Sequence, residues 1–528
     1  MEATSARVIE QTGWNLADIV RCGARDHPDR TAVRYGESSI SYRELDDRAT
    51  RVARGVCALE VTRQARVAFL DFNTSTYLEV LFGTVKAGCV LVGINARLTA
   101  QEVMYILDDA TAPALFVGRE HYSLVESIET QLATVKHIIA LDGGHARWPD
   151  YCQWRDSQEA RDPLFEADQD SDMVQLYTSG TTGHPKGVCH THRGWREFSR
   201  AVKAASWADY DADTVTFVCM PLFHVAGFNL SCLTLMAGGC TVVSRRFDPN
   251  EILDLIPRHR ITDSLFVPAM ILELVGHSRA PTTDFSSLRH ISYGAAPIAN
   301  ELLLRAQLLF GCGFVHLYGL TENLGCATYL SPQMHRAELG KQKSCGHAYG
   351  GLELRIVDAA GRTVPTGVTG EIVVRSAWTM RGYWRNSDAT NEAIRDGWLH
   401  TGDAACLDAD GYVYIQDRVK DMIVSGGENV YPAEVENALC GHPAIAEVAV
   451  IGVPDPKWGE AVKAMVVLKT GASLDVDDVL NHARTHIAGY KLPKSIEVIA
   501  ALPRNASGKV LRRQLREPYW RGRERQVS

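Results

Sequence analysis

Short apolar runs alternate with amphipathic stretches along the first part of the chain. Runs at 66–71, 89–93 and 114–117 have the length of buried strands. Apolar residues at 45–59 recur at helical spacing behind the capping box of Ser41 and Glu44, which predicts a helix that covers a sheet. Alternating strands and helices predict βαβ units and a parallel sheet.

The pattern continues far beyond one sheet. We expect further strands at 137–141, 214–218, 262–267 and 290–293, and hence two or more wound sheets. No charged residue occurs from 215 to 244, a stretch long enough for a membrane helix. Pro221, Asn229 and Gly238 break it into strand, helix and strand, so we predict no membrane span.

The pattern changes in the last third of the chain. Residues 352–374 predict antiparallel hairpins or a small barrel, and the charged segment 417–421 marks a candidate boundary. The segments beyond it predict a separate α+β domain of about a hundred residues. The predicted fold class is therefore α/β, with a large N-terminal domain of wound sheets plus a barrel-like subdomain at 1–417, a hinge at 418–421 and a small α+β domain at 422–528.

Composition narrows the class of protein. A chain of 528 residues is too long for one core, and its net charge of −8 argues against nucleic-acid binding. Thirteen cysteines without a C-x-x-C pair fit neither a disulfide framework nor a zinc site. The N-terminal sequence has no apolar export segment, so we expect a cytoplasmic protein. The arginines after Arg512 predict a solvated helix face.

A glycine- and hydroxyl-rich stretch at 177–187 is the strongest candidate for chemistry. Gly180, Gly183 and Gly187 allow backbone N–H groups to turn inward, and Lys186 adds a positive charge, as a phosphate loop requires. Pro185 and Gly187 flank that lysine, which disfavours a P-loop NTPase. A polar surface turn stays open as the alternative for this stretch alone.

Further motifs follow in a fixed order, at 221–224, 294–297, 318–322, 398–403, 417–418, 426–427 and 508–509. Together with the loop they resemble the adenylate-forming superfamily of acyl-CoA synthetases, nonribosomal peptide adenylation domains and luciferases, over nearly the whole chain. The resemblance implies a two-step reaction. A carboxylate attacks the α-phosphate of ATP and expels pyrophosphate, and a thiol, usually that of coenzyme A, then captures the acyl adenylate.

The resemblance implies roles for particular residues. Lys509 is the implied mobile catalytic lysine, and His224, Thr181 and Glu322 complete the catalytic set, with Thr181 and Glu322 also holding Mg²⁺. The implied ATP and AMP contacts are Thr178, Ser179, Gly180, Thr181, Thr182, Gly183, Lys186, Gly294, Ala295, Ala296, His316, Leu317, Tyr318, Gly319, Thr321, Glu322, Asp403, Arg418 and Lys509.

The second step implies a mobile small domain that turns about Lys420. The implied coenzyme A contacts are Ser425, Gly426, Gly427, Trp458 and Lys491, and for Trp458 a packed aromatic is an equal alternative. The implied acyl pocket consists of His224, Phe228, Asn229, Tyr293, Gly319 and Asn323. Tyr293 departs from the small residue common before the glycine turn.

These expectations define a function with alternatives. The favoured function is an AMP-forming ligase that joins a medium- or long-chain fatty acid to coenzyme A, in fatty-acid metabolism. An aryl or cinnamate-type acid ligase is the close competitor, and an adenylating enzyme that serves another acceptor or activates another oxyanion is the second class. The expected partners are the acid, ATP and coenzyme A, without nucleic acid, and a homodimer stays open.

Overall fold

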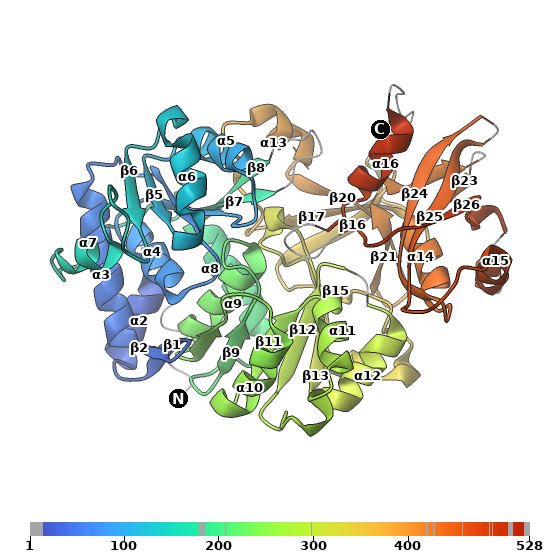
Figure 1. Cartoon of the computed structure of the whole chain (residues 1–528), viewed down its shortest axis with the longest axis horizontal. Coiled ribbons are helices and arrows are strands. Elements are labelled where there is room, and N and C mark those ends of the chain that lie inside the picture. Colours follow the sequence, from blue (N-terminus) through green and yellow to red (C-terminus); the bar gives the residue numbers. More distant parts are fainter. Residues whose placement is uncertain are drawn as a thin grey trace.

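The computed structural model describes residues 14–178, 185–205, 207–296, 298–418, 421–425, 428–456, 458–484, 486–487, 489–504 and 510–521. Two large α/β sheets fill the left and the bottom of the view in Figure 1, and the C-terminal residues form a smaller lobe at the upper right. The two sheets, sheet A and sheet B, share a continuous apolar core.

Sheet A is mostly parallel. Within the described residues its strand order is β15-β14-β13-β12-β11-β9-β10-β1-β2, in which β2, β14 and β15 run antiparallel to their neighbours. Its strands are β1 (Thr31–Tyr35), β2 (Ser38–Ser41), β9 (Val215–Val218), β10 (Cys240–Val243), β11 (Asp263–Phe266), β12 (His290–Gly294), β13 (Gly313–Tyr318), β14 (Thr328–Leu330) and β15 (His347–Ala348).

Sheet B repeats this plan with the order β18-β8-β7-β4-β3-β5-β6. Its parallel strands are β3 (Arg66–Leu70), β4 (Val90–Ile94), β5 (Ala114–Val117), β6 (His137–Ala140) and β7 (Asp172–Thr178), and β8 (Lys186–Thr191) and β18 (Gly382–Tyr383) close one edge in antiparallel pairs. β7 and β8 pair with each other as a hairpin, and the candidate phosphate loop lies between them in the sequence.

Helices lie between the sheets and on their outer faces. The shared core contains residues of α2 (Asp18–Asp26), α3 (Tyr42–Ala58), α4 (Ser75–Lys86), α7 (Tyr151–Asp156), α8 (His192–Ala204) and α9 (Val225–Met236). Because α4 contacts strands of both sheets, it is buried around its whole circumference. The outer faces are covered by α10 (Pro249–His259), α11 (Pro268–Gly276) and α12 (Asn300–Phe310) on sheet A and by α5 (Ala100–Ala110) and α6 (Tyr122–Ile128) on sheet B.

Two further sheets complete the chain. The antiparallel sheet C contains β16 (Leu352–Val357), β17 (Gly370–Ser376), β19 (Ile394–Arg395), β20 (Trp398–Leu407) and β21 (Val413–Arg418), and α13 (Ser387–Ala393) precedes β19. The C-terminal sheet D contains β22 (Ile423–Ser425), β23 (Glu428–Val430), β24 (Ile445–Asp455), β25 (Gly459–Leu468) and β26 (Ser495–Val498), with α14 (Pro432–Cys440), α15 (Val476–Arg484) and α16 (Arg512–Trp520).

Most sequence expectations for the elements are confirmed. The capping box at Ser41 is present, and 215–244 forms β9, α9 and β10. The prediction of a solvated face after Arg512 was wrong for Arg516, whose guanidinium lies 3.2 Å from the carboxylate of Asp421 with only 18% of its side chain exposed. Here α16 packs along β24, so Arg512 and Arg516 face the protein, whereas Arg513 and Arg521 are exposed as predicted.

Candidate active site

The β7–β8 hairpin stands on a buried ionic base. Asp172 accepts hydrogen bonds from Arg66 and Arg381, each with its closest contact at 2.6 Å, and the Arg66 guanidinium lies 3.4 Å from the ring centroid of Trp384. Tyr177 donates to Asp109 at 2.5 Å. Buried charges held by several partners fix geometry, so the hairpin supplies a rigid base for the loop. Residues 179–184, which include the predicted Ser179, Gly180, Thr181, Thr182 and Gly183, lie outside the described residues.

One aromatic ring joins the hairpin to the predicted metal ligand. The Lys186 ammonium lies 4.9 Å from the ring centroid of Tyr383, and the Tyr383 hydroxyl donates to Oε1 of Glu322 at 2.8 Å. Burial, with the adjacent Glu322 charge, raises the pKa of Tyr383 well above its ordinary value, so this hydroxyl stays a donor. Thr178 pairs with Lys186 across the hairpin. The structure thus brings Thr178, Lys186 and Glu322 to one place.

Sequence reasoning missed Tyr383. It lies on β18, a strand of two residues that is too short to produce a periodic signal. Its neighbour Trp384 was missed for the same reason, although its indole donates to the Asp109 carbonyl at 3.0 Å. The only available signal was the aromatic pair after Gly382, a position where the backbone φ of +154° favours glycine.

The ends of β12 and β13 approach each other too closely for side chains. A Cβ on Gly294 would lie 2.3 Å from the carbonyl oxygen of Leu317, and a Cβ on Gly319 would lie 2.2 Å from the backbone of Gly325. Ala295 has a φ of +65°, a strained value for a residue with a side chain. This turn places bare backbone beside Tyr318, as a flat ligand such as adenine requires.

The predicted adenine and ribose residues are in contact. Tyr318 donates its hydroxyl hydrogen to Oδ2 of Asp403 at 2.7 Å. Asp403 is buried and lies opposite Arg418 in the β20–β21 register. Tyr318 ends a strand of sheet A and Asp403 lies on sheet C, so this contact fixes one sheet against the other.

His316 and Tyr293 form a stacked pair beside this turn. Their ring centroids are 4.7 Å apart with an interplanar angle of 8°, and the Tyr293 hydroxyl lies 3.0 Å from Nε2 of His335. Nδ1 of His316 lies 3.0 Å from the Ser344 carbonyl oxygen, and burial lowers the pKa of His316 to about 4. Tyr293 is thus fixed by packing on the same strand pair that carries Gly294.

The residues predicted for the acyl pocket occupy different depths. His224 caps the N-terminus of α9, where its Nδ1 accepts from the Ala226 N–H at 3.3 Å, and burial lowers its pKa to about 4. A neutral imidazole is therefore present at neutral pH. Phe228, one turn further on, is fully buried in the shared core.

Two asparagines tie α9 to the turn after β13. Asn229 accepts from the Trp195 indole at 3.0 Å and donates to the Leu324 carbonyl at 2.7 Å. Asn323 is fully buried and accepts from the Leu320 N–H at 2.8 Å, and its Nδ2 has no partner among the described residues. A buried unpaired donor of this kind is available to a ligand.

The predicted coenzyme A residues are dispersed over the C-terminal lobe. Ser425 is buried on β22, and its hydroxyl has no partner within the described part of the chain. The Lys491 ammonium lies 2.6 Å from Glu434, and the Trp458 ring is 38% exposed with Lys494 5.6 Å from its centroid. Gly426, Gly427, Lys420 and Lys509 lie outside the described residues.

Comparison with known proteins identifies the family. A sequence model described as AMP-binding enzyme matches residues 21–384, and one described as the AMP-binding enzyme C-terminal domain matches residues 434–509. The chain belongs to the AMP-binding enzyme family. The feruloyl-CoA synthase of an Amycolatopsis species is 39% identical over 94% of this chain and 97% of its own. The fatty acid–[acyl-carrier-protein] ligase ScoC of Streptomyces coeruleorubidus is 37% identical over 96% of both.

Solved structures of family members have the same fold. The anthranilate CoA ligase AuaEII in complex with anthranoyl-AMP superposes with a TM-score of 0.89 at 28% identity, over 96% of this chain and 97% of the other. The fold class and the assignment as an AMP-forming ligase, both predicted from the sequence, are confirmed by these comparisons. Among the described residues, no helix has both the length and the apolar character that crossing a bilayer requires.

Proposed function

We propose that this protein adenylates a medium- or long-chain fatty acid with ATP and transfers the acyl group to coenzyme A. The observation that supports the site most strongly is the chain of contacts from Lys186 through Tyr383 to Glu322. Through one ring it connects a cation at the start of β8 with a carboxylate in the turn after β13. The Tyr318 contact with Asp403 lies at the end of β13, where the nucleoside would bind.

In the first step a carboxylate oxygen of the acid bonds to the α-phosphorus, and the bond to the bridging oxygen of pyrophosphate breaks. The work of the protein is to position the reactants and to offset developing charge. Lys186 and the loop would hold the β- and γ-phosphates, and Thr321 would reach the α-phosphate. Asp403 accepts hydrogen bonds and Arg418 donates them, which suits the two ribose hydroxyls.

In the second step the thiol sulfur bonds to the acyl carbon, the thiol proton is lost, and AMP leaves. Lys509 would serve the first step only, since the C-terminal lobe would turn between the steps. We propose a division at 1–417, 418–421 and 422–528. It is supported by the end of β21 at Arg418 and the start of β22 at Ile423, which belong to different sheets.

The donor set near Glu322 suits Mg²⁺. Within the described residues no three metal-ligating side chains gather in one cluster. One carboxylate with a threonine hydroxyl leaves most positions to phosphate oxygens and water, which is how Mg²⁺ usually binds beside nucleotides. Glu322 and Thr181 would hold the ion, and its charge would offset that of the triphosphate. The Tyr383 hydroxyl orients the Glu322 carboxylate.

An aryl acid is the second candidate substrate. The identity of 39% to a feruloyl-CoA synthase exceeds the 37% to the fatty-acid ligase ScoC, and an indoleacetate–CoA ligase of Aromatoleum aromaticum is 36% identical. A carrier protein is the alternative acceptor, because the ligase ScoC is named for one. Coenzyme A as the acceptor is supported by the buried Ser425 hydroxyl and by the two glycines that follow it in the sequence, which are predicted to line the thiol path.

A panel of acids tests this proposal. The purified protein is incubated with ATP, Mg²⁺ and single acids, with and without coenzyme A, and pyrophosphate, AMP and thioester are measured by mass spectrometry. We expect AMP and thioester in equal amounts with a fatty acid of medium or long chain. If thioester formed only with aryl acids, the substrate class would be aryl acids. Pyrophosphate release without thioester would mean that the acceptor is not coenzyme A, and the absence of AMP with every acid would contradict the proposal.

A further inference from the structure

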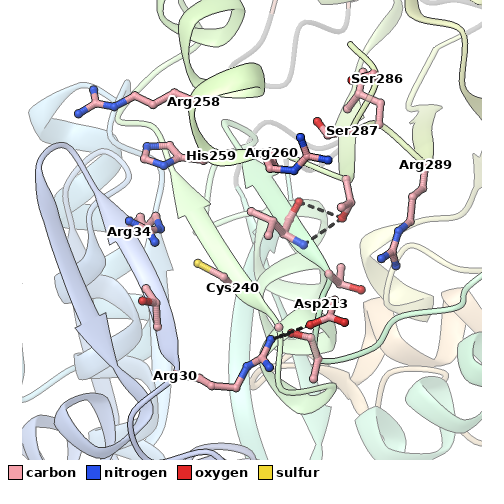
Figure 2. Close-up of a pocket in the computed structure, with 17 residues that line it drawn as sticks. Arg30, Arg34, Asp213, Cys240, Arg258, His259, Arg260, Ser286, Ser287 and Arg289 are labelled. Atoms are coloured by element: carbon pink, nitrogen blue, oxygen red, sulfur yellow. Dashed lines mark hydrogen bonds and ion pairs between the residues drawn. The ribbon is translucent and has the colours of Figure 1, made fainter. Parts of the chain in front are cut away.

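A large basic pocket lies away from the candidate active site. Its volume is about 1000 Å³, and it lies where β1, β9, β10, β11 and β12 begin (Figure 2). We call it the arginine pocket, after the side chains that line it: Arg30, Arg34, Arg258, Arg260 and Arg289. This volume is at the upper end of the range for pockets that bind small molecules.

The arginine pocket and the candidate active site lie at opposite edges of sheet A. Thr262 and Arg289, which immediately precede β11 and β12, line the pocket, whereas Gly294 at the far end of β12 lies in the predicted nucleotide turn. Five residues of strand span roughly 16 Å. A molecule in the pocket would therefore not overlap a nucleotide bound beside Tyr318.

The positive charge in this pocket exceeds what its neighbours compensate. Asp213 is the single acidic side chain in the described lining, and it pairs with Arg30 at 3.1 Å. Outside the lining, Glu37 pairs with Arg258 at 2.8 Å and Asp211 pairs with Arg289 at 3.3 Å. Among the described residues Arg34 and Arg260 form no ion pair, although Arg260 lies near enough to the exposed Asp284 to help lower the pKa of that carboxyl.

The positive charge of the pocket also affects a neighbouring titratable group. Burial, with the charges of Arg34 and Arg258, lowers the pKa of His259. The Arg34 guanidinium donates to the hydroxyl of Ser39 at 3.1 Å and also interacts with the Cys240 thiol, and neither partner carries a countercharge at neutral pH. The whole chain carries a net charge of −8, so this concentration of positive charge is not a general property of the surface.

The floor of the pocket is polar. Thr214 and Thr262 are buried there, and the Thr262 hydroxyl accepts from the Val215 N–H at 2.9 Å. Ser286 and Ser287 add hydroxyls to the rim. The hydroxyls of Thr214, Thr262 and Ser287 already donate to Asp211, Asp263 and the Ile261 carbonyl, respectively. The donors left for a ligand are therefore the guanidinium groups, whose geometry matches phosphate oxygens.

We propose that the arginine pocket binds a soluble phosphorylated small molecule with at least two phosphate groups, at a site separate from the one for ATP. A lipid headgroup offers the same chemistry. A membrane surface is disfavoured because none of the exposed large apolar side chains of the described residues lines this pocket. A concave site of this size suits a free molecule.

Calorimetric titration with inorganic tripolyphosphate tests this site. The same probe should also bind at the candidate ATP loop, so one titration compares the two sites. We expect two binding events with the full-length protein. Arg34→Ser combined with Arg260→Ser should weaken one event at least tenfold and leave the other unchanged, and Lys186→Ala should do the reverse. The control combines Arg25→Ser with Arg362→Ser, two exposed arginines outside the pocket, and should alter neither event.

The outcomes separate the two sites. A single event that only Lys186→Ala weakens would overturn the arginine pocket and leave the proposed function intact. Equal weakening by the pocket variants and by the control would show non-specific attraction and would also overturn it. If the wild-type protein showed only the event that the pocket variant weakens, the arginine pocket would stand, and the result would count against phosphate binding by the candidate ATP loop.

A second arm separates a soluble ligand from a membrane. Vesicles of phosphatidylglycerol are sedimented with the wild-type protein and with the pocket variant at matched ionic strength. We expect no difference between the two proteins. The proposal would be overturned in favour of a lipid surface if the wild-type protein sedimented with the vesicles, the pocket variant did not, and tripolyphosphate gave no second binding event. Arg34→Lys with Arg260→Lys keeps the charge and should retain measurable binding, which guards against a folding defect.

Discussion

At the residue scale, the ring of Tyr383 connects the charges on which the site depends. Its face lies near the Lys186 ammonium and its hydroxyl donates to Glu322. A ring in this position attracts the cation weakly and orients the carboxylate through a charge-assisted hydrogen bond. Tyr383 is therefore a positioning residue that acts through Glu322.

Tyr383→Phe tests this role. Because the hydroxyl that orients Glu322 is lost, the Mg²⁺ concentration for half-maximal pyrophosphate release should rise about tenfold. The matched control is Tyr519→Phe, which removes a similar hydrogen bond to Glu497 in the C-terminal lobe. A magnesium titration identical to that of the wild type would exclude the positioning role.

Buried histidines predict the pH dependence of stability. Burial lowers the pKa of His190, His192, His224 and His316 to about 4 each, against roughly 6.5 in an unfolded chain. Between these values the unfolded chain binds more protons than the folded one, so the free energy of unfolding is highest above about pH 6.5 and falls as the pH decreases toward 4.

His192→Asn isolates one of these groups. The asparagine keeps an acceptor for the Leu16 N–H, which Nδ1 of His192 now accepts at 3.1 Å. Urea denaturation between pH 7 and pH 5 should show a shallower loss of stability in this variant, by up to about 1.4 kcal/mol per pH unit. An unchanged slope would mean that His192 titrates normally in the folded state.

The sequence predicted which residues belong to the candidate site, but not which of them contact one another. Tyr318 and Asp403 were each predicted from a motif, but the hydrogen bond between them depends on how sheets A and C meet. Tyr383 and Arg66 carry no motif of their own, because their importance comes from partners more than sixty residues away. Local pattern cannot predict such contacts.

At the element scale, the β7–β8 hairpin explains how a glycine-rich loop can be held in place. Asp172 at the start of β7 binds the guanidinium groups of Arg66 from β3 and Arg381 from the segment before β18. The hairpin is thereby tied to β3, which lies beyond β4 in sheet B, and to the segment before β18 at the edge of the sheet. The ionic base that fixes the hairpin was not predictable from local sequence pattern.

Asp172→Asn tests this base. The substitution leaves the buried Arg66 guanidinium without its counter-charge, so the free energy of unfolding should fall by about 3 kcal/mol in chemical denaturation. Asp170→Asn is the control, since the exposed Asp170 pairs with Arg193 at the surface and should change stability by less than about 0.5 kcal/mol. Equal effects of both variants would rule out a special role for the buried base.

At the scale of the whole molecule, the large lobe holds the predicted nucleotide site and the C-terminal lobe carries the predicted catalytic lysine. The change from parallel sheets to antiparallel strands followed from the sequence, because strand periodicity and turn residues are local signals. How the strands divide between sheets A and B did not follow from it. The boundary at 418–421 and the rotation about Lys420 stay predictions. They concern residues 419 and 420, which lie outside the described residues.

The most direct test of the account separates its two half-reactions in the Lys509→Ala variant, with an acid identified from the panel. Pyrophosphate release from ATP and the acid should fall at least about 100-fold, because the cation that offsets charge at the α-phosphate is lost. Thioester formation from supplied acyl adenylate should remain within about twofold of the wild type, as should both steps in the exposed-lysine control Lys469→Ala. Equal loss of both steps in Lys509→Ala, or no loss of either, would contradict the account.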